Sequence, residues 1–333
     1  MKKPIIISVF FFLMASSLFP QAGYSEISSM PGAFSRLGFG ARGIGMGNAM
    51  SSITEGNLVS YYNPALSAFQ QDNSFAASYS FLSLDRTLNF LNFTKRFELK
   101  SKSQDTAKRQ VRTPGLSFGI INAGVTKIDG RDNQGMQTGD LSTSENQFFL
   151  SFSNRFSEKL AIGLAVKFYY FKLYEKITTS GIGFDIGALY TLSGRMNLSL
   201  VLTDLNSKYK WDTAPVRQES GKTTENKFPI GKKVGLSYRI PEYKIIASAE
   251  FEGYGKGANF LRFGAEYNIY DQLFLRGGID KFNLSNKDYP ARPAVGFSYF
   301  KKLSGFIAGI DYAFVPEPYS SSGEHILGIN VNF

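Results

Sequence analysis

The chain has 333 residues, no cysteine and a formal net charge of +10 at pH 7. The absence of cysteine excludes a disulfide framework, a thiolate metal site and a cysteine nucleophile. Aromatic residues are abundant, with 31 Phe and 18 Tyr against one Trp, and 33 Gly accompany them, a composition typical of a β-rich protein and unusual for a helical globular one.

Residues 1–22 have the layout of a secretory signal peptide. Lys2 and Lys3 precede an apolar run from Ile5 to Phe19, and small residues follow around Ala22. The run is shorter than the ~20 residues of a spanning helix, and no charged stop-transfer cluster follows it. We predict cleavage near Ala22, which lowers the formal charge from +10 to +8 by removing the two lysines. The remaining charge is explained by attraction to anionic lipid head groups, so we predict no nucleic-acid partner.

Residues 23–70 lack clean alternation and are rich in Gly, Ala, Ser and Asn. They contain GFGARGIGMGNAM at 38–50 and YYNPALSAF at 61–69. Gly38, Gly40 and Gly43 match the spacing of a dinucleotide-binding loop, but no βαβ unit surrounds them, so we interpret the match as a false positive. Missing side chains permit tight turns and close backbone approach. We predict that this segment is a plug, or hatch, inside a barrel.

From residue 71 onward, segments with period-two alternation recur up to the C-terminus. Between 160 and 170, the even-numbered residues are large and mostly apolar, whereas the odd-numbered residues are small or polar. This pattern indicates strands whose two faces meet different environments. No stretch after the signal reaches the ~18 unbroken apolar residues of a membrane-spanning helix. We predict fourteen strands, near 74–84, 87–97, 115–127, 146–155, 160–173, 181–191, 195–204, 230–240, 243–253, 258–269, 272–281, 291–300, 304–314 and 324–333.

The connections favour a transmembrane barrel over a soluble β-sandwich, which would also alternate. After the third strand, short turns of one or two residues alternate with longer connections, at 128–145, 174–180, 205–229, 254–257 and 282–290. Short periplasmic turns and long outer loops are typical of outer-membrane barrels. We predict an all-β, transmembrane antiparallel β-barrel over residues 71–333, integral to the outer membrane of a Gram-negative-type bacterium.

The last predicted strand ends on an aromatic residue. Ile329, Val331 and Phe333 share one face, with Asn330 and Asn332 on the other. A terminal Phe in register with an alternating strand resembles the signal read by the outer-membrane assembly machinery. We therefore predict that Phe333 is an assembly signal and that this machinery is a partner.

Strand parity also predicts which charged residues face the lumen. Six bases and six acids share this face: Lys167, Arg195, Lys233, Arg239, Arg262, Arg276, Asp185, Glu250, Glu252, Glu266, Asp280 and Asp311. An ion-selective pore would show an excess of one sign, whereas balanced charges indicate ion pairs that brace the wall. We expect Arg36 and Arg42 to anchor the plug to inward carboxylates such as Glu250 or Glu266.

Three short motifs carry a resemblance to a known family. They are Gly40-Ala41-Arg42, Met46-Gly47 and Asn63-Pro64-Ala65, and later segments such as FDIGALY at 184–190 and GAEYNIYDQLFLRGG at 264–278 agree in order. In these features the sequence resembles the PorV/PorQ family, a branch of the FadL-like outer-membrane barrels. The resemblance spans nearly the whole mature chain. It implies a fourteen-stranded barrel in which the segment with the Asn-Pro-Ala motif forms the hatch.

The resemblance implies two interpretations of function. PorV/PorQ members serve type IX secretion, which implies a docking, shuttle or attachment component for secreted cargo proteins. FadL-like members pass hydrophobic molecules, which implies the alternative, a channel for uptake of hydrophobic small molecules. Inward aromatic residues at Phe149, Phe260 and Phe274 are compatible with this alternative. Outer-membrane lipid is an expected partner under both interpretations.

No catalytic residue, metal site or cofactor is predicted. An outer-membrane hydrolase needs an activated nucleophile and usually a histidine base. The only histidine, His325, falls on the outward parity of the last strand. We therefore expect a non-enzymatic protein.

Overall fold

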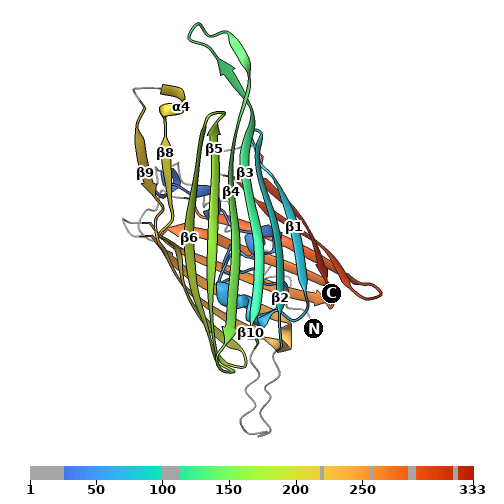
Figure 1. The fold of residues 1–333 in the computed structure, drawn as a ribbon. Helices are drawn as coiled ribbons and strands as arrows, with labels where there is room; N and C mark the ends of the chain where they lie inside the picture. The colour runs from blue at the N-terminus through green and yellow to red at the C-terminus, as the bar shows by residue number, and fades with distance from the viewer. Residues whose placement is uncertain (1–25, 99–112, 218–220, 255–257, 284–289, 318–321) are drawn as a thin grey trace.

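The fold is a closed antiparallel barrel of fourteen strands (Figure 1), which confirms the predicted fold class and strand number. The computed structural model describes residues 26–98, 113–217, 221–254, 258–283, 290–317 and 322–333, so the predicted signal peptide lies outside the described residues. The barrel strands are β1 (Ser74–Phe81), β2 (Arg86–Arg96), β3 (Gly115–Arg131), β4 (Gln137–Arg155), β5 (Leu160–Tyr174), β6 (Ile177–Ser193), β7 (Met196–Leu205), β10 (Gly231–Ile240), β11 (Ile245–Gly253), β12 (Asn259–Tyr270), β13 (Leu273–Asn283), β14 (Arg292–Lys302), β15 (Ile307–Val315) and β16 (Glu324–Asn332).

Each barrel strand pairs with its sequence neighbours, with two exceptions. β7 pairs with β10, and β1 pairs with β16 to close the barrel. Between β7 and β10, the chain forms a separate two-stranded sheet of β8 (Lys208–Asp212) and β9 (Thr223–Lys227), joined through the short helix α4 (Ala214–Arg217). A one-turn helix η6 (Pro241–Tyr243) joins β10 to β11. In the part of the chain that the structure describes, no helix is long and apolar enough to cross a membrane.

The two ends of the barrel differ in their connections. The connections after β1, β3, β5, β7, β11, β13 and β15 share one end, here called the long-loop end. The other is called the short-turn end, because its connections are short except for residues 97–114 between β2 and β3. The β3–β4 and β8–β9 hairpins project beyond the rim at the long-loop end (Figure 1). The predicted loops at 128–145 and 174–180 were wrong in detail, because β3–β4 and β5–β6 continue as hairpins. Alternation fades there because both faces are polar, while the backbone pairing persists.

Large apolar side chains point away from the barrel interior. On β5, the side chains of Ile162, Leu164, Val166 and Phe168 are 41–47% exposed, whereas Ala165 between them is buried. A soluble sandwich has the opposite polarity, with its large apolar face turned inward. An outward apolar wall is what a barrel in a lipid bilayer requires.

Residues 26–73, here called the N-terminal segment, lie against the inner wall of the barrel (Figure 1). The segment contains α2 (Glu26–Ser29), η2 (Ala33–Arg36), α3 (Gly40–Gly45) and η3 (Pro64–Phe69). Helix α3 contacts β1 and β13–β16, and η3 contacts β2–β6 on the other side. The segment therefore touches both the first and the last strands of the barrel.

Phe333 closes the seam between the first and last strands. Its backbone N–H and C=O pair with Asn73 at 3.0 Å each, and its ring lies 6.5 Å from that of Phe93. We expect deletion of Phe333 to lower the amount of heat-modifiable barrel, measured as the fast-migrating band of an unheated gel. The deletion removes both backbone bonds at the seam. Phe333→Tyr retains them and should behave like the parent; normal membrane levels of the deletion would refute a role in assembly.

Candidate functional site

On one side of the barrel, the N-terminal segment is held by a buried ion pair. The guanidinium of Arg42 on α3 donates from Nε and Nη2 to the two carboxylate oxygens of Glu266, each at 2.9 Å. Glu266 also pairs with Arg276 of the neighbouring strand, and all three residues are buried. Arg42 further donates to the carbonyl of Asn57 at 2.9 Å. One arginine thus joins α3 to the wall and to the next loop of the segment, and the predicted pairing of Arg42 with Glu266 is confirmed.

A second buried cluster is centred on Arg262. Its guanidinium pairs with Glu250 at 3.0 Å, with Asp280 at 2.7 Å and with Glu252. Lys233 pairs with Glu252 at 3.2 Å. Two of these carboxylates also hold the N-terminal segment, because Asn48 donates to Asp280 and the backbone N–H of Ser51 donates to Glu250. The same acids therefore brace the wall and bind the segment.

On the opposite side, the contacts rest on small residues. A Cβ added to Gly163 would lie 2.3 Å from the backbone of Pro64, so this wall position needs glycine for close approach. The hydroxyls of Ser67 and Ser153 are 2.7 Å apart. Asn63 caps η3 by accepting from the N–H of Ala65, and its amide donates to backbone carbonyls at residues 51 and 188. The Asn-Pro-Ala motif thus sits where the segment and the wall approach each other closely.

The other motif residues lie in or beside α3. Gly40, Ala41 and Arg42 begin the helix, and Met46 and Gly47 follow it. Gly47 has a φ of +58°, and a Cβ there would lie 2.5 Å from the backbone of Ile279. All eight predicted hatch residues therefore belong to the N-terminal segment, and several face the wall.

Ten of the twelve predicted lumen charges are buried inside the barrel; two are not. Arg195 lies in the turn between β6 and β7 and pairs with Glu242 of the next turn at 2.8 Å, with its side chain half exposed. The lumen assignment of Arg195 was therefore wrong, because strand parity ends at Ser193. Arg239 lies at the rim of the short-turn end. It pairs there with Glu55 of the N-terminal segment at 3.1 Å.

The contacts of Arg36 also differ from the prediction. Arg36 donates to the carbonyls of Ile27, Met30 and Pro31 within its own segment, so its expected pairing with an inward carboxylate was wrong.

Asp204 was missed as a lumen acid. It is buried at 3.1 Å from the ammonium of Lys167, which also pairs with Asp185 at 2.7 Å. The left-handed φ of +61° at Asp204 breaks the parity of β7 and hides this position from a period-two pattern.

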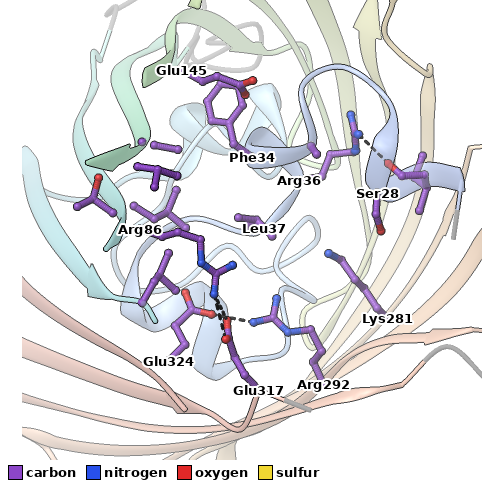
Figure 2. Close-up of a pocket in the computed structure, with 18 of the residues that line it drawn as sticks. Ser28, Phe34, Arg36, Leu37, Arg86, Glu145, Lys281, Arg292, Glu317 and Glu324 are labelled. Atoms are coloured by element: carbon purple, nitrogen blue, oxygen red, sulfur yellow. Dashed lines mark hydrogen bonds and ion pairs between the residues drawn. The ribbon is translucent and has the colours of Figure 1, made fainter. Parts of the chain in front are cut away.

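A cavity of about 1200 Å³ opens above the N-terminal segment at the long-loop end, here called the mouth cavity (Figure 2). Its apolar lining comes from the segment and from the wall, and includes Phe34, Leu37, Leu82, Leu88, Phe171 and Phe260. Of the three inward aromatics noted in the sequence, Phe260 lines this cavity, whereas Phe149 packs against Phe39 and Phe274 against Phe300. The mouth cavity is thus a mixed site built from residues far apart in the chain.

Charged groups surround the apolar lining. Arg86 pairs with Glu317 at 3.1 Å and Arg292 with Glu324 at 2.7 Å, both visible in Figure 2. Lys281 also lines the cavity. At the edge, the hydroxyl of Tyr254 donates to Glu252 at 2.6 Å. Burial raises the pKa of Tyr254 well above its usual range, and the adjacent carboxylate raises it further, so this phenol remains a neutral donor.

A second, smaller cavity lies at the short-turn end. It has a volume of about 190 Å³ and lies between residues 53–55 of the N-terminal segment and the wall at β6, β7, β10 and β11. The contacts that hold the segment here are more exposed than those of Arg42. The Glu55 and Arg239 side chains are 41% and 46% exposed, and Thr54 accepts from Asn197 at 3.2 Å. Residues 53–57 therefore form the least buried attachment among those described above.

Among the residues that the structure describes, no group of three or more His, Cys, Asp or Glu is arranged to hold a metal ion. His325 lies on the outer face of β16, where its Nδ1 is 2.7 Å from the hydroxyl of Tyr312. The interior of the barrel offers ion pairs, hydroxyls and the mouth cavity. This arrangement is suited to binding or passage.

Solved structures of outer-membrane barrels have a fold similar to that of this chain. The Pseudomonas putida toluene transporter TodX superimposes with a TM-score of 0.55 at 14% identity, over 94% of this chain and 98% of that one. A Pseudomonas aeruginosa FadL homologue gives 0.53 at 9% identity, over 89% and 98%. No family model matches the sequence, and no curated protein matches it. The chain thus shares the fold of FadL-type outer-membrane barrels.

We expect Arg42→Met to weaken the attachment of the N-terminal segment by about 3 kcal/mol, because it removes one partner of a buried ion pair. Limited proteolysis in detergent micelles should cut the segment faster while the barrel remains intact. Arg42→Lys, which retains the charge without the two-point hydrogen bonding, should show a smaller effect. Protection of Arg42→Met equal to that of the parent would show that the pair does not hold the segment.

Proposed function

We propose that this protein is a non-enzymatic outer-membrane channel that takes up small hydrophobic molecules through the mouth cavity. The observation that supports this proposal most directly is the mouth cavity itself. It combines a volume of about 1200 Å³ with apolar side chains from the N-terminal segment and the wall. Ligand sites for small molecules are typically concave and mostly apolar, with a few polar groups that fix orientation. The cavity has this composition, and it faces the long-loop end, where solutes from outside arrive.

The polar groups of the mouth cavity suit a ligand with at most a small polar part. Arg86 and Arg292 are each paired with a glutamate, so their charges are already compensated. At Arg86 and Arg292, a free carboxylate or ammonium of a ligand would have to compete with these pairs. The side chains of Leu37, Leu82 and Phe171 line the cavity and are only partly buried, so their apolar surface is available to an uncharged solute.

The similar structures support this proposal over the secretion interpretation. TodX is described as a toluene transporter and as a monoaromatic hydrocarbon channel. This similarity concerns the fold alone, and the apolar lining of the mouth cavity is an independent reason for the proposal. The docking or shuttle role for secreted cargo proteins, which the sequence resemblance implied, gains no support from these relatives or from the cavity.

The N-terminal segment is proposed to be the hatch that closes this channel. A fourteen-stranded barrel encloses more space than its own side chains fill, since about eight strands already suffice for a filled interior. The segment occupies this space and contacts strands on both sides. Passage of a solute therefore requires displacement or rearrangement of part of the segment.

We expect bromobenzene, an apolar aromatic probe, to quench the fluorescence of Trp211 in a saturable manner. Trp211 is the only tryptophan, and its ring lies 5.1 Å from that of Phe171, which lines the mouth cavity. Ala123→Phe should remove the saturable part by filling the cavity. Ala308→Phe, on the outer face of β15, is the matched control. Saturable quenching that survives Ala123→Phe, or that is absent in the parent, would contradict the proposal.

We expect the intact protein to show little steady conductance in planar bilayers and removal of residues 23–70 to open it. Glu55→Arg should give an intermediate conductance, because it places two cations together at Arg239 and loosens residues 53–57. The matched control is Glu242→Arg, which disrupts a similarly exposed pair with Arg195 on the same rim without touching the segment. Conductance of an open porin in the parent, or a closed but well-assembled deletion, would rule out the hatch.

A further inference from the structure

A groove crosses the outer wall of the barrel over β14, β15, β16 and β1, with a volume of about 690 Å³. Strand register explains its shape. One row of outward side chains runs along its first edge through directly paired positions, Phe297, Tyr312, Leu327 and Tyr79. A second row runs along the other edge through Ile310, Ile329 and Ala77. Between the rows lie Asp311, Gly328 and Ser78. The side chains of Asp311 and Ser78 belong to the inner face, and the backbone of the three residues forms the floor of the groove.

The groove has a low edge on β1, and elsewhere packed side chains fix its shape. Ala77 is the small member of the second row, so the edge is low there. The ring of Tyr312 is held by its hydroxyl contact with His325 and by packing against Phe297 at 5.5 Å. Helix α3 backs the wall from inside, where a Cβ on Gly45 would lie 3.6 Å from Ala313. The groove is therefore preformed.

The first row continues past Tyr79 as a ladder of outward asparagines. Asn89 pairs with Tyr79 across β1 and β2, and its amide donates to Asn122 at 3.1 Å. The amide of Asn122 donates in turn to Asn146 at 2.7 Å. Polar groups on a lipid-facing wall are costly unless they are hydrogen-bonded. The same row thus passes from an apolar groove to a hydrogen-bonded, uncharged polar strip.

We propose that this groove binds one glycerophospholipid of the surrounding bilayer. An acyl chain lies in the apolar part between the two rows, and the ester and glycerol oxygens lie at the asparagine ladder. The groove is continuous with the apolar wall, which is already in contact with lipid in an outer-membrane barrel. The outward side chains that line the groove are uncharged, which favours the neutral glycerol region over a phosphorylated sugar lipid as the recognised group.

The test uses introduced tryptophans as reporters. In a Trp211→Phe background, Tyr79→Trp places the reporter in the groove, and Tyr190→Trp places it on the outer face of β6; the two tyrosines are similarly exposed, at 44% and 42%. Delipidated protein in nonionic detergent micelles is titrated with dibrominated phosphatidylcholine. We expect saturable quenching of the reporter at position 79, complete at one lipid per barrel, and only weak, non-saturating quenching at position 190.

A variant that fills the groove distinguishes a lipid bound in the groove from lipid that merely surrounds the barrel. Adding Ala77→Phe should abolish the saturable quenching, whereas Ala188→Phe on the outer face of β6 should leave it unchanged; fast migration on unheated gels confirms that each variant is a folded barrel. Equal quenching at the two reporters, or quenching that survives Ala77→Phe, would overturn the proposal. Stronger displacement of the probe by lipid A than by unlabelled phosphatidylcholine would overturn the assignment to a glycerophospholipid.

Discussion

The structure depends on one mismatch of size, because a closed ring of fourteen strands is wider than its inward side chains can fill. The chain supplies the missing volume from its own N-terminal segment. The two sides of the wall accommodate the segment differently. Glycines of the wall let the backbones approach closely on both sides, but around α3 the wall also provides carboxylates that meet Arg42 and the amide of Asn48. The groove outside and the mouth cavity above are both bounded by the wall that results.

The buried charges add specificity to this packing. A charge moved out of water loses hydration that a single partner in a dry interior does not fully replace. Here the costly groups share partners: Arg262 contacts three carboxylates, and Glu266 contacts two arginines. Such a network accepts a segment only when its donors arrive in the correct positions. The wall thereby selects one placement of the segment among many that would fill the same space.

Strand number, strand faces and most inward charges could be predicted from the sequence, because lipid and lumen impose opposite demands on alternate residues. Arg195 and Asp204 show where that logic ends. Arg195 lies beyond the last paired residue of β6, and Asp204 sits where a left-handed residue breaks the alternation. The mouth cavity could not be predicted from the sequence for another reason. Its lining runs from Ile27 to Glu324, and no local pattern reveals which distant residues a closed barrel brings together.

The position of Arg42 has a consequence for the order of folding. Its partner Glu266 lies 224 residues further along the chain, and helix α3 also contacts β15 and β16, the last strands to leave the ribosome. Contacts of such long sequence separation form late, since the intervening chain must first be organised. The segment that is synthesised first is therefore among the last to find its place. Docking of the segment therefore requires that the last strands have already joined the wall. In a barrel that lacks its final strands the segment would stay undocked, and this difference distinguishes an incomplete barrel from a complete one.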